Sequence, residues 1–133
     1  MRMRTWRIPG ALPGILFCFA WVVVAAAGGL AADLFAEGDW AGCRRECERT
    51  LAQTPDDESA QLLGAVCRVR LTNHVEQGCT QLVTLTTFAT SANVRSMAAY
   101  ELGRVEWAKA DAGAGSDSAD RAYRLFRQSF LET

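Results

Sequence analysis

The sequence predicts an all-α protein: a short array of antiparallel helical hairpins preceded by an apolar signal or anchor helix. Three observations predict it. The motif Ala-x-x-Leu-Gly at residues 60–64 returns 39 residues later at residues 99–103, and Ala-x-x-x-Phe follows at residues 122–126. Apolar residues recur at helical spacing around each motif. Small residues let two helices approach closely, so the repeated motif indicates stacked hairpins.

The first 32 residues have the pattern of a secretory signal. Arg2, Arg4 and Arg7 precede an uncharged apolar run from Ala11 to Ala32 that ends in small residues. We expect cleavage, which leaves residues 33–133 as an exported domain, periplasmic or secreted. The run has 22 residues and is long enough to span a membrane. An uncleaved inner-membrane anchor that leaves the domain facing the periplasm is therefore the alternative.

The charge balance of residues 33–133 bears on the class of partner. This part of the chain has 11 basic and 15 acidic residues, and 11 − 15 = −4. Binding to a phosphate backbone needs clustered positive charge. We therefore expect no nucleic-acid partner.

The first helix of the domain is expected at residues 39–53, after the turn at Gly38 and Asp39. A second helix follows, with Thr54 as its N-cap and Pro55 in its first turn. Its apolar residues recur at helical spacing up to Leu71, and we expect the face that they form to be buried.

A third helix is expected to start at a capping box from Asn73 to Glu76 and to run to Thr87. Residues 81–88 are rich in β-formers, so a strand is the rival interpretation there. We favour a helix, because a lone strand among helices has no partner.

The fourth helix is expected to start at a cap on Thr90 or Ser91 and to end at Lys109. A flexible Gly-rich loop follows at residues 112–116, and a fifth helix runs from Ser118 to the C-terminus.

One segment resembles a tetratricopeptide repeat, in which each unit is a helix–turn–helix of about 34 residues. The match places a Gly, an acid, an aromatic, two residues at core positions, a Leu and a Pro at the spacing of the family: Gly38, Asp39, Trp40, Cys43, Cys47, Leu51 and Pro55. The resemblance covers about residues 34–131. The first helix of the first unit is nearly missing from this alignment, because only residues 33–37 separate it from the apolar run. The Trp that the family has before its Leu-Gly pair is absent.

The resemblance implies a function. Similar proteins are non-catalytic interaction or assembly modules that hold an extended peptide or a helix in the groove formed by the first helix of each unit. Carried onto this chain, the partner-binding candidates are Gln61, Arg68, Arg95 and Arg104. Trp107 lies beyond the motif, and it is either a core residue or an exposed binding aromatic. The partner implied is another protein or peptide, with no cofactor.

Four cysteines follow the apolar run: Cys43, Cys47, Cys67 and Cys79. The first interpretation is that they are core thiols, since buried Cys behaves as a small apolar residue. The second is a disulfide between Cys67 and Cys79, or between Cys43 and Cys67, which an exported protein permits. The third is thiol redox or metal chemistry that includes His74, although the spacing departs from the usual zinc motifs.

Two surfaces complete the predictions. The charged residues of the fourth helix, Glu101, Arg104, Glu106 and Lys109, are spaced as a solvated face of ion pairs. The last helix carries Phe126, Phe130 and Leu131, which either pack inward or dock a partner or a second copy. The chain contains no recognisable catalytic motif, and a membrane-tethered accessory subunit for envelope assembly is the alternative function.

Overall fold

The computed structural model describes residues 29–132. This part of the chain is all-α, as predicted, with six α-helices, one wide π-type turn (η3) and no strand. The elements in chain order are α2 (Gly29–Glu37), α3 (Trp40–Gln53), α4 (Glu58–Arg70), α5 (Val75–Phe88), α6 (Ala92–Lys109), η3 (Ala110–Ala114) and α7 (Ser116–Glu132).

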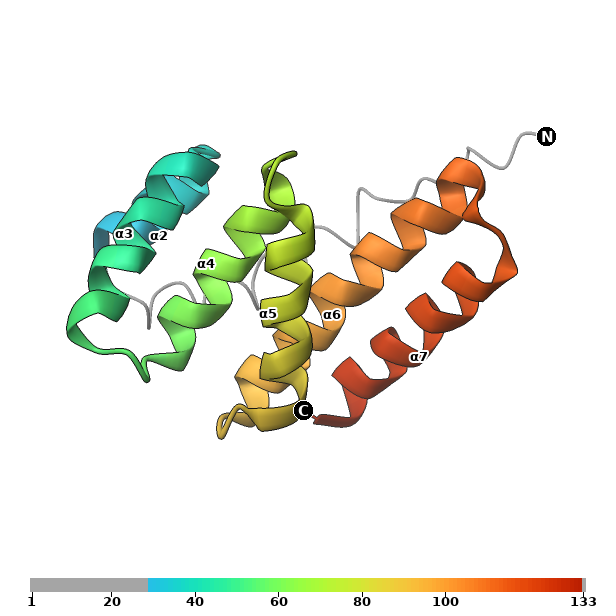
Figure 1. The fold of residues 1–133 in the computed structure, drawn as a ribbon. Helices are drawn as coiled ribbons and strands as arrows, with labels where there is room; N and C mark the ends of the chain where they lie inside the picture. The colour runs from blue at the N-terminus through green and yellow to red at the C-terminus, as the bar shows by residue number, and fades with distance from the viewer. Residues whose placement is uncertain (1–28, 133) are drawn as a thin grey trace.

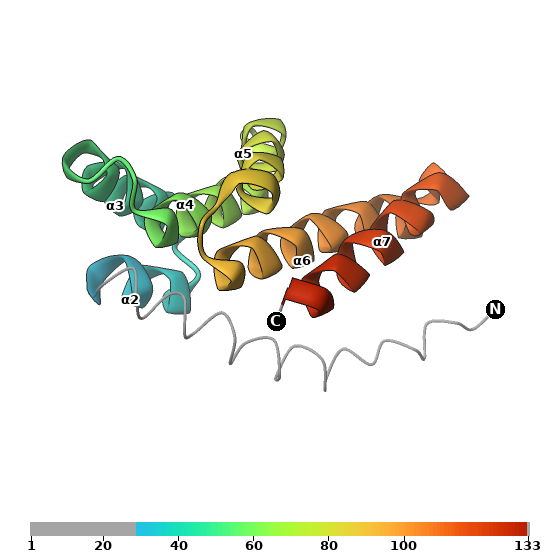
Figure 2. The ribbon, with the colours of Figure 1, turned by 90° about the horizontal axis from the view of Figure 1, so that it is seen from below.

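Each helix packs mainly against its neighbours in the sequence. The most extensive contact joins α6 and α7, which lie side by side and antiparallel (Figures 1 and 2). The chain also reverses direction between α3 and α4 and between α4 and α5 (Figure 1). One further contact, between α4 and α6, joins helices that are not consecutive.

Helix α2 corrects one prediction. The alignment left this helix nearly missing, whereas α2 has nine residues and packs against α3. Ala31 and Ala32 are buried in a cluster with the thiols of α3 and α4. Helix α2 starts before the predicted domain boundary at residue 33, and the boundary itself stays a prediction. The rest of the predicted signal or anchor, residues 1–28, lies outside the described residues.

The start of α3 was predicted correctly, and the N-cap of α4 was not. Asp39 accepts a hydrogen bond from the Gly42 amide at 2.8 Å and starts α3. Thr54 does not start α4, because its own amide donates to the Thr50 carbonyl and closes α3. Asp57 starts α4 instead, by accepting from the Ala60 amide at 3.1 Å.

Helix α5 confirms the helical interpretation of the β-rich segment and corrects its start. The predicted capping box at Asn73 does not form, because α5 has His74 as its N-cap, without a side-chain capping bond. Threonine hydroxyls within α5 donate to carbonyls one turn back, which satisfies them inside a helix. The donors are Thr80, Thr84, Thr86 and Thr87.

The bounds of α6 and α7 agree closely with those predicted from the sequence. Ser91 is the N-cap of α6, and the helix ends at Lys109 as expected. The Gly-rich loop is shorter than predicted, since η3 continues from α6 and α7 already begins at Ser116. Gly113 and Gly115 have φ values of 100° and 94°, a left-handed backbone that glycine adopts without strain.

The core has two parts, and the repeated motif lies where helices touch. One cluster fills the space between α4, α5 and α6, and the other joins α2, α3 and α4. A Cβ on Gly64 of α4 would be 3.3 Å from the Cβ of Cys47 on α3, and one on Gly103 of α6 would meet the Phe126 ring of α7. Both Leu-Gly pairs therefore mark close helix contacts, as predicted.

Candidate functional site

An open groove of about 490 Å³ lies where α4 ends, α5 begins and the second half of α6 passes. We call it the arginine groove. Aliphatic residues from all three helices and charged residues from α4 and α6 line it: Val69, Arg70, Val75, Glu101, Arg104, Val105, Ala108, Lys109 and Ala112. Three of the lining side chains are cationic and one is a carboxylate.

Glu101 lies between two arginines in this groove. Its side chain is 9% exposed, and Arg104 Nη1, one turn further along α6, lies 3.4 Å from its Oε2. Arg70 Nη2 at the end of α4 lies 3.9 Å from its Oε1. This arrangement corrects the expectation of a solvated charged face, because Glu101 is buried. Two guanidinium groups share one buried carboxylate.

Aromatic rings hold Arg70 in place. Its guanidinium carbon lies 4.8 Å from the ring centroid of Trp40 and 5.7 Å from that of Phe35. The two rings contact each other edge to face, with centroids 5.2 Å apart. Burial lowers the pKa of the Arg70 guanidinium, against the attraction of Glu101, and nearby Arg104 lowers it further. Arg70 lines the groove, and within the described residues its N–H donors make no hydrogen bond.

A second charge cluster lies at the α7 side of the groove. Glu106 accepts from Lys109 Nζ at 3.0 Å and from Arg121 Nε at 3.1 Å. Burial raises the pKa of Glu106, but these two hydrogen bonds lower it more, so the net shift is downward. Lys109 is 51% exposed and lines the groove, whereas Arg121 does not line it.

The structure places Arg104 in the groove and the other predicted partner-binding residues outside its lining. The side-chain amide of Gln61 donates to the Pro55 carbonyl at 2.7 Å, within the turn before α4. Trp107 is 57% exposed, so of its two interpretations the core residue does not apply. Whether any of these residues contacts a partner stays a prediction.

The buried side chain of Arg68 links three helices, α3, α4 and α5. It is 8% exposed and donates to Glu48 on α3 at 2.7 Å and to Gln81 on α5 at 3.0 Å. Its Nε is buried without a partner in the described structure. The side chain of Arg68 therefore serves contacts within the chain.

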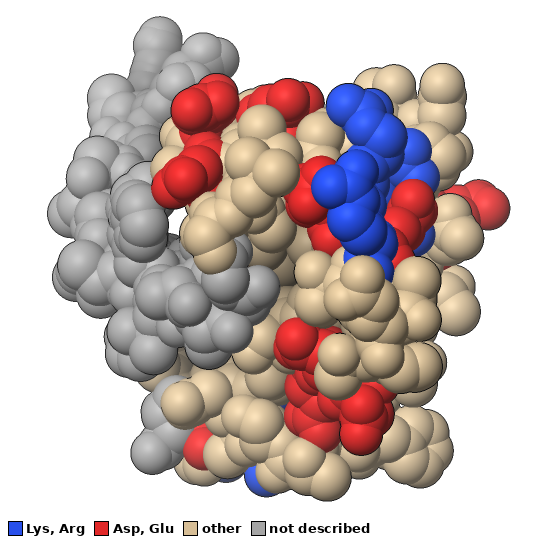
Figure 3. Space-filling view, turned by 90° about the vertical axis from the view of Figure 1, so that its left-hand side faces the viewer, with Lys and Arg blue, Asp and Glu red and all other residues tan. Residues whose placement is uncertain are grey.

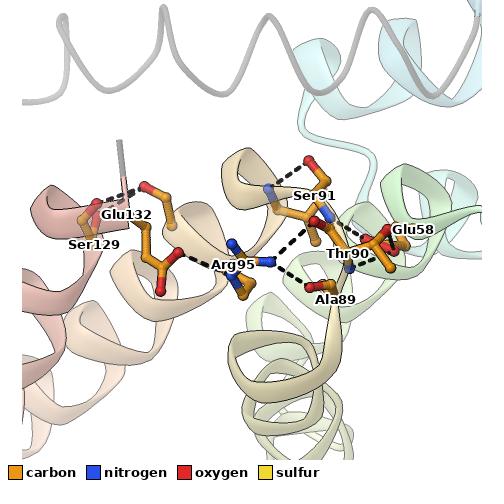
Figure 4. A network of polar contacts seen from close by, with 9 residues as sticks. Glu58, Ala89, Thr90, Ser91, Arg95, Ser129 and Glu132 are labelled. Atoms are coloured by element: carbon orange, nitrogen blue, oxygen red, sulfur yellow. Dashed lines mark hydrogen bonds and ion pairs between the residues drawn. The ribbon is translucent and has the colours of Figure 1, made fainter.

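Arg95 belongs to a polar network that joins α4, the α5–α6 loop and the end of α7 (Figure 4). It donates to the carbonyls of Ala89 and Thr90 at 2.7 and 3.1 Å, and to Glu132 at 2.9 Å. Glu58 at the start of α4 accepts from the Thr90 amide at 2.8 Å and also from the Thr90 hydroxyl. Nearby, the hydroxyl of Ser96 donates to the Ser129 carbonyl at 2.8 Å.

The face formed by α2 and α3 carries paired charges. Figure 3 shows that basic side chains gather in one area of this face, with acidic side chains beside them. On α3, Arg44 pairs with Glu48 at 2.8 Å and Arg49 pairs with Glu46 at 3.1 Å. Much of the positive charge of α3 is thus balanced within the same helix.

Three thiols meet in the core between α3 and α4. Cys43, Cys47 and Cys67 are at most 1% exposed, whereas Cys79 on α5 is half-buried, and all four are free. The hydrogen bond with Cys47 lowers the pKa of Cys43, but contact with Cys67 and burial raise it more, to about 12. Its hydrogen bond to Cys43, followed by burial, raises the pKa of Cys47 even further. The disulfide alternatives stay predictions.

Sequence reasoning missed Arg70, the best-positioned cation of the groove. Its neighbours Phe35 and Trp40 come from α2 and from the start of α3, and α2 is the helix that the alignment left out. The available signal was a second arginine in the last turn of α4, one residue beyond Val69 and two beyond Arg68.

The chain matches no protein-family model, and no curated protein or solved structure is significantly similar to it. In residues 29–132, no helix is long and apolar enough to cross a membrane. The same residues contain no group of three or more His, Cys, Asp or Glu side chains placed to hold a metal ion. The geometry therefore carries the functional argument.

Proposed function

We propose that this chain is an exported, non-catalytic protein–protein interaction module of the tetratricopeptide type, which holds a segment of a partner in the arginine groove. The support from the fold is that each helix from α2 to α6 packs against the next helix in the chain, as stacked hairpins do. In a repeat array of this kind, α2, α4 and α6 are the first helices of their units and face the concave side.

The residues around Arg70 fit that arrangement. Phe35 is on α2, Arg70 on α4, and Glu101 and Arg104 on α6, and they contact one another in sequence. The first helices of three units thus contribute to one continuous surface.

The single observation that carries the proposal is the composition of the groove. Aliphatic side chains such as Val69, Val75 and Val105 form an apolar wall beside half-exposed cations. Sites that bind other molecules combine an apolar surface with a few polar groups that fix orientation. The groove is open to solvent, which suits a segment of a partner chain better than an enclosed small molecule.

The non-catalytic part of the proposal comes from the family resemblance alone. Export rests on the pattern of the first 32 residues alone, with the uncleaved anchor as its alternative.

Site-specific photo-crosslinking tests the proposal. A benzophenone amino acid replaces Lys109 in the groove or, as the control, Arg124 on the exposed face of α7. We expect a protein adduct of defined mass from the Lys109 position in cells that make this chain, and none from the Arg124 position. Equal crosslinking at both positions, or none at Lys109, contradicts the proposal.

The intact mass of the natively produced protein tests export. Loss of about thirty N-terminal residues supports a cleaved signal. A full-length mass in the membrane fraction supports the tethered accessory subunit instead.

A further inference from the structure

We infer that the arginine groove selects a partner segment with an acidic side chain next to an aliphatic one, whose carboxylate binds between Arg70 and Arg104. This inference rests on the proposed function and names the chemistry of the partner. It starts from the charges that the fold leaves in excess around Glu101.

One arginine is enough to neutralise Glu101, and two are present. Arg104 makes one long hydrogen bond to it at 3.4 Å, and Arg70 only an ion pair at 3.9 Å. A guanidinium group has five N–H donors, so most donors of both groups remain unused within the described structure. Both groups approach the same carboxylate, and they therefore repel each other. A second carboxylate, supplied by the partner segment, relieves that repulsion and accepts hydrogen bonds from the free N–H donors.

The two arginines also differ in a way that suits binding. Arg70 is fixed by Trp40 and Phe35 and is only 27% exposed, so its position is set before a ligand arrives. Arg104 is 45% exposed and can close over a ligand from the α6 side. A preorganised donor costs less entropy on binding than a mobile one.

The aliphatic part of the segment has a surface to contact. Val69 and Val75 lie beside Arg70 in the lining, and Val105 and Ala108 continue it along α6. A partner with only acidic side chains leaves this wall exposed to water. The groove therefore fits a mixed acidic and aliphatic sequence better than a polyacidic one.

Two matched peptides test the inference by isothermal titration calorimetry on the full chain. Both are acetylated and amidated and read Gly-Val-X-Val-Gly, with X as Glu or Gln, so that only the central side chain differs. We expect the Glu peptide to bind roughly tenfold or more tightly, which corresponds to one charge-assisted hydrogen bond. Higher salt should reduce the difference, because the groove is open to solvent.

Two variants locate the effect. Arg104→Gln should abolish the preference for Glu, whereas Arg124→Gln, which removes an exposed arginine of α7, should leave it intact. Both positions are on the surface, and circular dichroism verifies that both variants fold. Equal binding of the two peptides, no binding of either, or an undiminished preference in Arg104→Gln overturns the inference.

The crosslinking experiment separates this inference from the proposed function. If Lys109 crosslinks to a protein but the Glu peptide is not preferred, the groove binds a partner and the acidic chemistry is wrong. If the Glu peptide is preferred but no protein crosslinks at Lys109, the charge selectivity is real and the proposed function fails.

Discussion

The ring of Phe126 on α7 lies against the backbone of Gly103 on α6, so closely that a Cβ on the glycine would be 2.6 Å from ring atom Cε1. The same ring contacts Tyr100, with centroids 5.5 Å apart. Glycine at this point lets the aromatic ring enter the space between the helices. This contact explains why the last hairpin has a Leu-Gly pair on one helix and an aromatic on the other.

Alanine at two glycines should have different effects on stability. In Gly78→Ala the new Cβ meets main-chain atoms of α4, the Ala65 carbonyl oxygen at 2.8 Å and the Val69 nitrogen at 2.9 Å. We expect a loss of about 1–3 kcal/mol, since main-chain atoms of a packed helix cannot yield easily. In Gly103→Ala the three nearest atoms all belong to the half-exposed Phe126 ring, a side chain that can move, so the loss should be smaller. A gain in helix propensity of about 1 kcal/mol offsets part of the cost in both variants.

Urea unfolding followed by circular dichroism measures both changes. The double variant Gly103→Ala with Phe126→Leu is the control, because a smaller side chain at residue 126 relieves the contact. Equal losses for Gly78→Ala and Gly103→Ala would show that the helix contacts are placed wrongly.

The close helix contacts show which parts of the fold could be predicted from the sequence alone. Gly64 and Gly103 were predictable because each follows a Leu in a repeated motif. Gly78 was not, because it lies in a segment without that motif, and its role depends on where α5 crosses α4. The N-cap of α4 was predicted wrongly for a related reason. Asp57 and Thr54 both have capping side chains, and only the actual path of the turn decides between them.

The candidate site was predictable in part. Arg104 was identified from its helix and lies in the groove, but Arg68 and Arg95 were chosen by the same rule and their side chains bind within the chain. A sequence pattern places a residue on a helix, and it does not tell which neighbouring helix covers it. Arg70 depends on the rings of Phe35 and Trp40, a contact between separate elements.

Arg68 and Arg104 should differ in what they contribute to stability. Arg68→Met keeps the apolar stem and removes the bonds to Glu48 and Gln81, so we expect a loss of about 1–3 kcal/mol. Arg104→Met removes one long, half-exposed ion pair, which is typically worth under about 1 kcal/mol. Thermal unfolding of the two variants measures the difference. A larger loss for Arg104→Met contradicts these roles.

Acid should weaken the fold partly through Glu58. Hydrogen bonds from the Thr90 hydroxyl and amide, and one from Ser91, lower its pKa below the ordinary value of 4.5. A carboxyl group with a lowered pKa stabilises the fold above its unfolded-state pKa, and this stabilisation is lost as the pH falls through the folded-state value. We therefore expect Glu58→Gln to flatten the decline in stability between about pH 5 and pH 3.

The matched control for Glu58 is Glu37→Gln, which changes an exposed glutamate at the end of α2. Its stability should follow that of the unchanged chain at every pH. Unfolding by urea at several pH values compares the three proteins. A Glu58→Gln curve that parallels the unchanged chain contradicts the role of the Glu58–Thr90 contact.

The thiols should differ in reactivity. Cys79 is half-buried, and burial raises its pKa. Cys43, Cys47 and Cys67 are fully buried, and the pKa values of Cys43 and Cys47 are raised by more. Because the thiolate is the reactive form, iodoacetamide at about pH 8 should label Cys79 first, and the other three only after unfolding. Peptide mass spectrometry of native and denatured samples reads the labels. Three labels at α3 and α4 in the folded protein, or a bridge that only reductant opens, contradicts this prediction.

The central claim is that the arginine groove is the surface that binds a partner segment. Amide chemical shifts of the isotopically labelled chain, recorded as the Glu peptide is added, test it most directly. The account predicts that shifts change around Val69 and Arg70, at the start of α5, and along α6 from Glu101 to Lys109. Changes centred on the exposed side chains of α7, such as Tyr123 and Leu131, with the groove unaffected, would contradict it.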